Sequence, residues 1–300
     1  MNQILYSFVY LVAKLPFKVL YFISDILYFL GYRILRYRAD VVSNNLKNSF
    51  PEKSKKELKL IEKQFFKNFY DFLIETLKGF AINQDEARNK IKFENVEFFA
   101  KAHQQKKNVI LLAGHNFNWE MANVAFDMFP QENYIAIYRK LNNKFWDKKV
   151  VESREKFGAQ LIPAHLVMKH IKDAENNGNY IYAFLADQSP FRKTIKFGVQ
   201  FLNQKTPVFT GYNRIENKDD LLYVYAEMLK PKRGKYHLIF KEISPEGEKF
   251  EEHELVVKFN KLLEKTITEH PENWLWTHKR WKYQDYVTDE MLYNGKDYKI

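Results

Sequence analysis

The clearest periodic pattern in the chain is a helical one that follows residue 54. Ser54 and Glu57, placed after Pro51, form a capping box, in which a serine hydroxyl and a glutamate carboxylate satisfy amides at a helix start. The helix is predicted to run to about Phe80. Its mostly apolar positions recur at helical spacing and predict one buried stripe, made of Leu58, Ile61, Phe65, Phe69, Phe72, Thr76 and Phe80. This stripe indicates core packing.

Beyond this helix, short β-rich apolar runs alternate with stretches that are long enough to be crossover helices. The runs span 109–113, 134–138, 161–163, 180–186 and 221–228, and the helical stretches span 119–128, 144–157, 166–176 and 254–269. Pro231, Arg233 and Gly234 predict a hairpin turn between the last two strands. The alternation predicts a single α/β domain with a mixed sheet covered by helices on both faces.

The amino-terminal residues 4–32 are almost wholly apolar, but Lys14, Pro16, Lys18 and Asp25 divide them into two runs. Neither run reaches the ~20 residues that a membrane-spanning helix needs. The two runs together predict either one kinked span or two helices that lie at the membrane interface. No small-residue cleavage site follows, which argues against a signal peptide. A helical hairpin packed on a soluble core is the structural alternative.

Three arginines follow the apolar runs at positions 33, 36 and 38. Cationic groups beside a membrane segment favour the cytoplasmic side for the rest of the chain. The sequence therefore predicts a membrane anchor over residues 1–38 and a cytoplasmic α/β domain over residues 39–300.

Composition narrows the chemistry. The 300 residues are 46% hydrophobic, which is enough for a sizeable core, and they carry a formal charge of +11. This charge favours contact with anionic partners such as phospholipid headgroups, phosphorylated sugars, acidic carrier proteins or nucleic acid. The chain contains no cysteine, so disulfides, thiolate metal sites and a nucleophilic thiol are excluded.

His115 is the strongest candidate for catalysis. It follows Gly114 at the end of the predicted strand 109–113, and Glu120 comes five residues later in the first turn of a predicted helix. Ligands bind at the carboxyl ends of strands in open α/β sheets, and an imidazole there can deprotonate a hydroxyl near neutral pH. A carboxylate on its other ring nitrogen would fix the tautomer. The same five-residue interval separates His170 from Glu175 and His237 from Glu242, but neither of these histidines lies at a strand-to-helix break.

The stretch Gly114-His115-Asn-Phe-Asn-Trp119-Glu120 resembles the His-four-Asp/Glu signature of glycerolipid acyltransferases. More closely, it resembles the lipid A biosynthesis acyltransferase family, within the glycerolipid and lysophospholipid acyltransferase-like superfamily. Further blocks fit that family in order: the basic stretch 32–38, residues 45–51, Tyr138-Arg139, Arg154-Glu-Lys-Phe-Gly158, Ala186-Asp187-Gln188 and Pro271-Glu272-Asn-Trp274-Leu-Trp276-Thr-His278-Lys-Arg280.

The resemblance implies a glycerol-3-phosphate acyltransferase-like fold and a bacterial inner-membrane enzyme whose catalytic domain lies on the cytoplasmic face. It implies that His115 is the general base and Glu120 its partner, acting on a hydroxyl that attacks an acyl thioester of acyl carrier protein or coenzyme A. No metal or other cofactor is expected. The candidate substrate-binding residues are Asn118, Arg139, Arg154, Asp187, Gln188 and Arg280. Arginines suit a developing oxyanion or acceptor phosphates, and Asp187 and Gln188 end another apolar strand, which predicts that they open onto the same rim as His115.

Other functions remain open at this point. A lysophospholipid or aminolipid acyltransferase would use the same dyad. A non-enzymatic protein that binds anionic lipid through its anchor and basic residues is a second possibility. Nucleic-acid binding lacks a recognised motif, and a metallohydrolase would need further ligands near His115.

Overall fold

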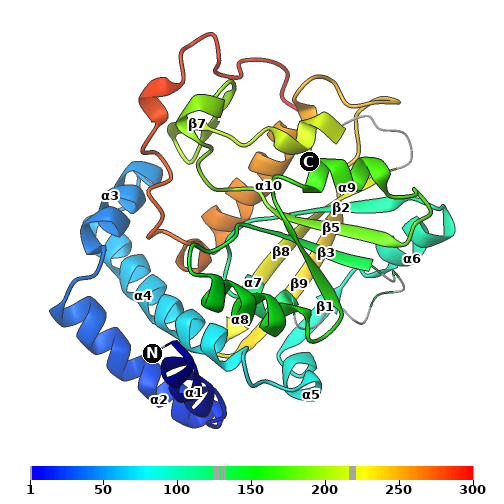
Figure 1. The fold of residues 1–300 in the computed structure, drawn as a ribbon. Coiled ribbons are helices and arrows are strands. Elements are labelled where there is room, and N and C mark those ends of the chain that lie inside the picture. Colours follow the sequence, from blue (N-terminus) through cyan, green and yellow to red (C-terminus); the bar gives the residue numbers. More distant parts are fainter. Residues whose placement is uncertain (1, 124–128, 130, 132, 216–220, 300) are drawn as a thin grey trace.

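The computed structural model describes residues 2–299 apart from 124–128, 130, 132 and 216–220, and within them seven strands form one sheet in the order β1-β9-β8-β2-β5-β3-β4 (Figure 1). The strands are β1 (Ile91–Glu94), β2 (Asn108–Ala113), β3 (Asn133–Tyr138), β4 (Ala159–Pro163), β5 (Tyr180–Leu185), β8 (Leu221–Lys232) and β9 (Lys235–Glu242). Neighbouring strands are parallel except for the hairpin of β8 and β9. The predicted mixed α/β domain, its five strands and the hairpin turn are confirmed.

The helices follow the sequence pattern closely. They are α1 (Asn2–Ala13), α2 (Phe17–Tyr28), the π-helix η1 (Phe29–Ile34), α3 (Ala39–Ser49), α4 (Lys55–Lys78), α5 (Gln84–Arg88), α6 (Glu97–Gln104), α7 (Trp119–Asn123), α8 (Lys144–Glu155), α9 (Val167–Asp173) and α10 (Glu254–Glu269). The capping box at Ser54 and Glu57 is present. The helix predicted over 119–128 is observed as far as Asn123, and its remainder lies outside the described residues.

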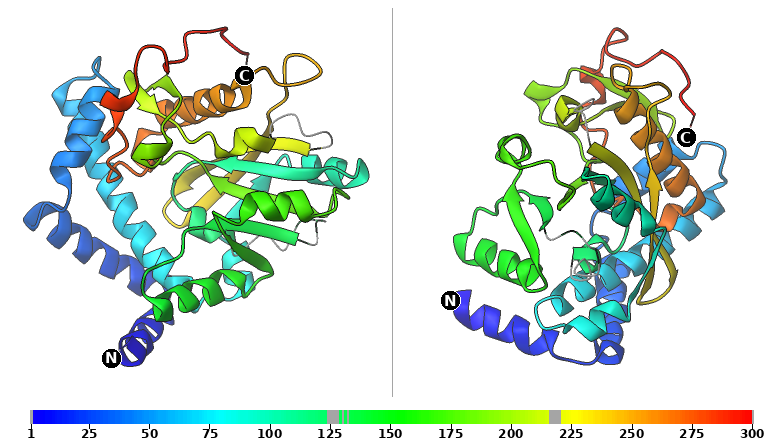
Figure 2. Two further views of the ribbon diagram at one scale, coloured as in Figure 1. Left: turned by 45° about the horizontal axis from the view of Figure 1, so that its top comes forward. Right: turned by 90° about the vertical axis from the view of Figure 1, so that its right-hand side faces the viewer.

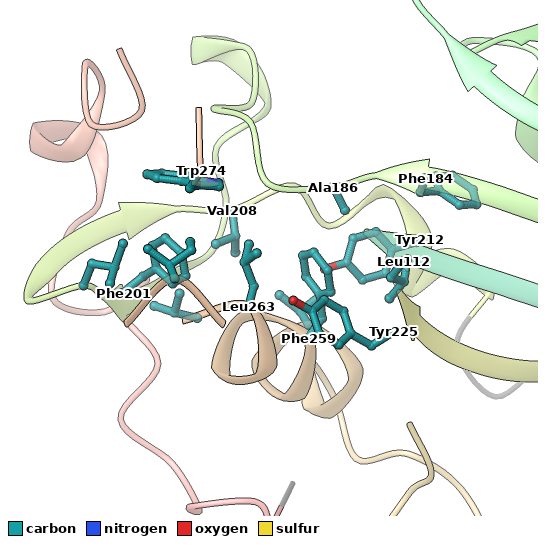
Figure 3. Close-up of a cluster of buried hydrophobic side chains, with 14 of the residues drawn as sticks. Leu112, Phe184, Ala186, Phe201, Val208, Tyr212, Tyr225, Phe259, Leu263 and Trp274 are labelled. Atoms are coloured by element: carbon teal, nitrogen blue, oxygen red, sulfur yellow. The ribbon is translucent and has the colours of Figure 1, made fainter. Parts of the chain in front are cut away.

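The sheet separates two apolar cores. One contains side chains of α3, α4, α9 and α10, and the other contains side chains of α5, α6 and α7. Successive β2 residues alternate between them, because side chains along a strand point to opposite faces: Ile110 and Leu112 face the first core, and Val109 and Leu111 face the second. Figure 3 shows part of the first core, in which Leu263 of α10 lies near Val208. Helices therefore cover both faces, as the sequence predicts.

Within the described residues, a small hairpin and four short 3-10 turns complete the fold. The hairpin joins β6 (Gly198–Phe201) to β7 (Gln204–Pro207), and the turns are η3 (Arg192–Thr194), η4 (Gly211–Ile215), η5 (Pro271–Asn273) and η6 (Gln284–Tyr286). The sequence pattern did not predict this hairpin, because its strands are only four residues long. Leu202 and Asn203 make its tight turn with positive φ angles of 49° and 61°.

The amino-terminal helices α1 and α2 lie along one side of the molecule, with α2 against α4 (Figures 1 and 2). In the described part of the chain, no single helix is long and apolar enough to cross a membrane. One pair, α1 with the continuous stretch Phe17–Ile34, meets the length and composition criteria together but bends by 114°. Large apolar side chains of this pair are solvent-exposed, namely Ile4, Leu5, Phe8, Leu11, Val19, Phe22, Ile26, Phe29, Leu30 and Ile34.

The inner face of α2 is held by a buried carboxylate rather than by apolar packing alone. Asp71 of α4 accepts hydrogen bonds from Ser24 of α2 at 2.8 Å, from Lys230 at 3.0 Å and from Arg233 at 2.7 Å. Arg233 also pairs with Asp25 on the exposed side of α2. The side chains of Asp71 and Lys230 are both buried, so each charge neutralises the other. Without its partner, either charge would be buried and unpaired.

Replacing Asp71 by alanine is expected to destabilise the fold by about 3 to 5 kcal/mol, because Lys230 is then left buried without a carboxylate. Asp25→Ala is the matched control, since it removes the exposed partner of the same arginine and is expected to cost less than about 1 kcal/mol. Urea unfolding followed by circular dichroism measures both values. Equal losses for the two variants would contradict this account of how α2 is held.

Candidate active site

The candidate site forms where β2 and β5 end side by side. These strands are parallel neighbours, with Ala113 opposite Leu185, and the Ala186 amide donates to the Ala113 carbonyl at 3.0 Å. Residues 114–118 leave β2 as a loop before α7 begins at Trp119. His115 and Asp187 each follow this last pair by two residues, so the adjacent strands bring them to the same edge of the sheet.

Asp187 binds His115 with both carboxylate oxygens. Its Oδ1 lies 2.5 Å from Nδ1 of the His115 ring, and its Oδ2 accepts a hydrogen bond from the His115 backbone amide at 2.8 Å. Oδ2 also accepts from the indole nitrogen of Trp274 at 2.7 Å. The Asp187 side chain is 2% exposed and that of His115 is 12% exposed. The carboxylate thereby fixes both the loop backbone and the orientation of the imidazole.

Gly114 allows this close approach. A Cβ atom at position 114 would lie 2.5 Å from Leu263 Cδ1, 2.8 Å from Asn116 Oδ1 and 3.3 Å from Asp187 Oδ2. A side chain there would push Asp187 and the loop apart. The glycine before the histidine therefore has a packing reason as well as a place in the motif.

The charge state of Asp187 follows from its partners. Burial raises its pKa, but the charge and hydrogen bonds of His115 and the Trp274 indole outweigh burial and lower the pKa to about 2. The carboxylate is thus ionised at neutral pH and holds the His115 proton on Nδ1. The other ring nitrogen, Nε2, is left as a hydrogen-bond acceptor, and the side-chain amide of Gln188 lies 3.0 Å from it.

The expected pairing of His115 with Glu120 is wrong. The Glu120 carboxylate accepts hydrogen bonds from Nε of Arg154 at 2.8 Å and from its Nη2, while Asp187 takes the His115 ring. The reason is the non-helical loop between His115 and α7. It places Glu120 in the first turn of a separate helix, where its side chain reaches α8.

Asn118, predicted to contact substrate, is instead a buried residue at the end of the loop. Its amide donates to Oε2 of Glu75 at 3.0 Å, and its Oδ1 accepts from the Met121 amide at 3.2 Å in the first turn of α7. Glu75 of α4 is 1% exposed and also accepts from Tyr21 of α2 and Tyr236 of β9. Asn118 therefore fixes the loop and links it, through Glu75, to the amino-terminal helices.

Arg280 is also buried rather than open to substrate. Its Nη1 donates to the Pro207 carbonyl at 2.7 Å, and burial lowers its pKa to about 10 while the Asp187 charge opposes that shift. Arg139 is exposed and lies with its guanidinium 5.3 Å from the centre of the Phe191 ring, in the segment that follows Gln188. Of the predicted binding residues, Asp187 and Gln188 thus contact His115 directly, and Arg154 adjoins the site through Glu120.

Three residues near the site were not predicted from the sequence to belong to it: Glu75, Trp274 and His278. Nε2 of His278 accepts from the Ser189 amide at 3.3 Å, two residues after Asp187. Burial lowers the pKa of His278 to about 4, and nearby Arg280 and His115 act in the same direction, against the opposing charge of Asp187. Trp274 and His278 lie in the carboxy-terminal block noted above, but only the fold reveals their contact with the strand ends.

A narrow apolar cavity of about 80 Å³ opens beside the loop on the α7 face of the sheet. Its lining includes Gly114, Trp119, Tyr134, Arg154, Met228 and Leu238, together with the small side chains Ala113, Ala122, Ala136, Ala183 and Ala226. Ala136 and Ala183 are register partners on β3 and β5, and Ala113 and Ala226 are partners on β2 and β8. These two alanine pairs are offset by two residues between β2 and β5, and their small side chains leave space above this part of the sheet. Within the described residues, no group of three histidine, aspartate or glutamate side chains has a metal-binding arrangement.

Comparison with known proteins places the chain in a family. Residues 3–283 match the family described as bacterial lipid A biosynthesis acyltransferase. The chain belongs to this family. A lipid A biosynthesis palmitoleoyltransferase of Escherichia coli is 22% identical over 270 residues, which cover 90% of this chain and 87% of the relative. A lipid A biosynthesis lauroyltransferase of the same organism is 25% identical over 276 residues, covering 91% and 88%.

A third relative, a lipid A biosynthesis acyltransferase of Shigella flexneri, is 22% identical over 270 residues, which cover 90% of this chain and 87% of the relative. The protein is accordingly an acyltransferase. In this member of the lipid A biosynthesis acyltransferase family, the matched residues run from α1 through the carboxy-terminal block. They include His115, Asp187, Trp274 and His278.

The half-buried His278 gives this acyltransferase a pH-dependent stability. Its folded pKa of about 4 lies below the ordinary histidine value of ~6.5, so the unfolded chain takes up the proton first as pH falls. The stability associated with neutral His278 is present above about pH 6.5 and is lost between there and about pH 4. His278→Gln keeps an acceptor for the Ser189 amide and is expected to flatten the fall of the urea midpoint across this window. His237→Gln, at a partly exposed position on β9, serves as the control and should keep the wild-type slope.

Proposed function

We propose that the protein transfers a fatty acyl group from an acyl thioester to a hydroxyl of a lipid A precursor, with His115 as the general base. The observation that carries this proposal is the pairing of His115 Nδ1 with the buried Asp187 carboxylate, which leaves Nε2 to accept a proton. Membership of the family supports acyl transfer, and the names of the relatives support a lipid A acceptor. Acyl carrier protein and coenzyme A are the two thioester donors considered.

The reaction needs no nucleophile from the chain. The acceptor hydroxyl oxygen attacks the thioester carbonyl carbon while its proton passes to Nε2 of His115. The new carbon–oxygen bond forms, the carbon–sulfur bond breaks, and the imidazolium returns the proton to the departing thiolate. Asp187 stabilises the imidazolium between these steps, since its carboxylate stays ionised. In this role Asp187 replaces the predicted Glu120.

Glu120 and Arg154 have a different task in this proposal. Arg154 lines the apolar cavity, and Glu120 orients its guanidinium from α7. Gly114 and Trp119, close to His115 in the chain, line the cavity, and its alanine side chains leave room along the sheet for a flexible apolar chain. We assign it to the first part of the acyl chain, with Arg154 near the thioester end. The relatives are named for palmitoleoyl and lauroyl transfer, so acyl groups of different lengths occur within the family.

Residues 1–38 are proposed to hold the domain formed by 39–300 at the cytoplasmic face of the bacterial inner membrane. The support is the exposed apolar surface of α1, α2 and η1, which ends at Ile34 and is followed by Leu35, 75% exposed, and by Arg36 and Arg38. Apolar side chains next to arginines suit a helix pair that lies in the interface of an anionic bilayer. The buried contacts of Tyr21 and Ser24 with α4 favour this arrangement over a detached span.

Replacing His115 by alanine is expected to lower acyl transfer by about 10² to 10⁴-fold, the usual contribution of a general base. Asp187→Asn should also cause a large loss, because asparagine cannot stabilise the imidazolium, and the loss should exceed that of Glu120→Gln. Transfer to a total lipid extract from labelled acyl carrier protein or acyl coenzyme A, resolved by mass spectrometry, measures the rates and identifies the acceptor. His237→Ala, a histidine on β9 with the same five-residue spacing to a glutamate, is the control. Full activity in Asp187→Asn combined with its loss in Glu120→Gln would restore the pairing predicted from sequence.

Membrane binding is tested on the exposed face of α1 and α2. Phe8→Gln combined with Phe22→Gln is expected to reduce sedimentation with anionic phospholipid vesicles at least tenfold, since two large apolar side chains no longer enter the bilayer. Leu60→Gln combined with Leu166→Gln changes two exposed apolar residues elsewhere and should leave binding unchanged. Equal binding by both double variants would place the membrane contact on another surface.

A further inference from the structure

Apart from the catalytic site, a cleft of about 1200 Å³ lies between the α3–α4 turn, the β6–β7 hairpin and η6. In Figure 1 these elements meet at the end of α4 that is farthest from α1. The volume exceeds the ~300 to 1,000 Å³ that is typical of sites for drug-sized ligands. The cleft is therefore large enough for an extended polar group.

The lining of the cleft is strongly basic. Five lysines face it against two carboxylates: Lys47, Lys53, Lys55, Lys59 and Lys205, with Glu62 and Asp285. Glu62 is already engaged, because Lys59 and the Tyr32 hydroxyl each bond its Oε1 at 2.8 Å. Among the described residues, Lys47 and Lys55 form no ion pair with a carboxylate. Two cationic groups are thus available for an anionic ligand.

The uncharged side chains of the cleft suit a sugar. Asn48, Asn203, Gln204 and Gln284 place side-chain amides around it, and an amide can both donate to and accept from a hydroxyl. Lysine ammonium groups bind phosphate as point charges. Lysines interspersed with amides therefore match a ligand that carries phosphates on a hydroxyl-rich ring.

Contacts connect the cleft to the exposed apolar helices on one side and to the segment that follows Gln188 on the other. Glu62 and Lys59, at its edge, contact Tyr32 of η1, two residues before the exposed Ile34. On the other side, η6 borders the cleft with Gln284 and Asp285. The next residue, Tyr286, lies with its ring 4.4 Å from the Arg192 guanidinium, in the segment that follows Asp187 and Gln188. A headgroup in the cleft can thus belong to a bilayer lipid while its chains extend toward His115.

We propose that this cleft binds the phosphorylated sugar headgroup of the acceptor lipid, with Lys47 and Lys55 as its principal phosphate contacts. The inference rests on the proposed function for the identity of the lipid, but it assigns a binding site that lies apart from the catalytic residues. Its concave shape and its contact with Tyr32 favour a lipid headgroup over an acidic protein, whose docking surface would be flatter and need no contact with the apolar helices.

The test measures binding without turnover. The 300-residue chain carrying His115→Ala is sedimented with phosphatidylcholine vesicles that contain lipid A precursor, either intact or after phosphatase treatment. Adding Lys47→Gln and Lys55→Gln is expected to weaken binding to the intact headgroup about fivefold per lysine, with little effect on the dephosphorylated vesicles. The matched control adds Lys56→Gln and Lys63→Gln, which remove the same charge from α4 outside the cleft and should keep the preference for phosphate. In the His115 enzyme, the cleft variant should raise KM for the acceptor and leave kcat nearly unchanged.

The outcomes separate this site from the proposed reaction. An unchanged phosphate preference in the Lys47 and Lys55 variant overturns the proposal, as does an equal loss in both double variants, which would indicate general attraction to the membrane. Loss of acyl carrier protein binding with headgroup preference intact would also overturn it and identify a protein-docking cleft. If the wild-type enzyme transfers no acyl group but its preference for the phosphorylated headgroup depends on Lys47 and Lys55, the cleft assignment stands and the proposed reaction fails.

Discussion

The site depends on one buried carboxylate, that of Asp187, which binds the backbone and the ring of His115 together. An ionised group with 2% exposure is costly unless every lone pair finds a donor, and three donors converge on it: the His115 amide, the His115 ring and the Trp274 indole. Meeting this requirement fixes the end of β2 against the end of β5 and draws the carboxy-terminal segment over both. The orientation of the proposed base is thus a consequence of how the fold accommodates a buried charge.

Sequence reasoning was reliable where a pattern is local. The strands at 109–113 and 180–186 and the helix Glu254–Glu269 follow from periodicity, and the position of His115 at a strand end follows from them. The carboxylate that bonds the ring lies 72 residues away, two residues after β5, which is the neighbour of β2 in the sheet but not in the chain. Sequence proximity instead favoured Glu120, whose direction depends on the loop that separates it from His115. Because spatial order in a parallel sheet is set by crossovers, no spacing rule within one segment reveals such a pair.

The contacts of the amino-terminal apolar segment also could not be predicted from the sequence. Its hydrophobicity predicts contact with a membrane but gives no sign that its inner face is polar. In the structure, Ser24 and Tyr21 reach two buried carboxylates of α4, Asp71 and Glu75, and Glu75 in turn holds Asn118 in the loop after His115. The helices that expose apolar side chains therefore belong to the same polar network as the loop. A boundary at residue 38 therefore separates an exposed apolar surface from the rest of the protein surface. It does not separate two independent structural units, because the polar network crosses it.

In the proposed reaction, a bound thioester faces two hydroxyl nucleophiles, the acceptor and water. The ring of His115 is 12% exposed and is flanked by Trp119, with ring centres 4.8 Å apart, while the Gln188 amide occupies the neighbourhood of Nε2 at 3.0 Å. A base whose free nitrogen already has a donor does not require a water molecule to satisfy it. An acceptor hydroxyl must displace Gln188 to reach Nε2, and a lipid held by many contacts sustains that displacement better than a single water does. Transfer rather than hydrolysis then follows from the competition between one glutamine and the incoming hydroxyl at the same nitrogen.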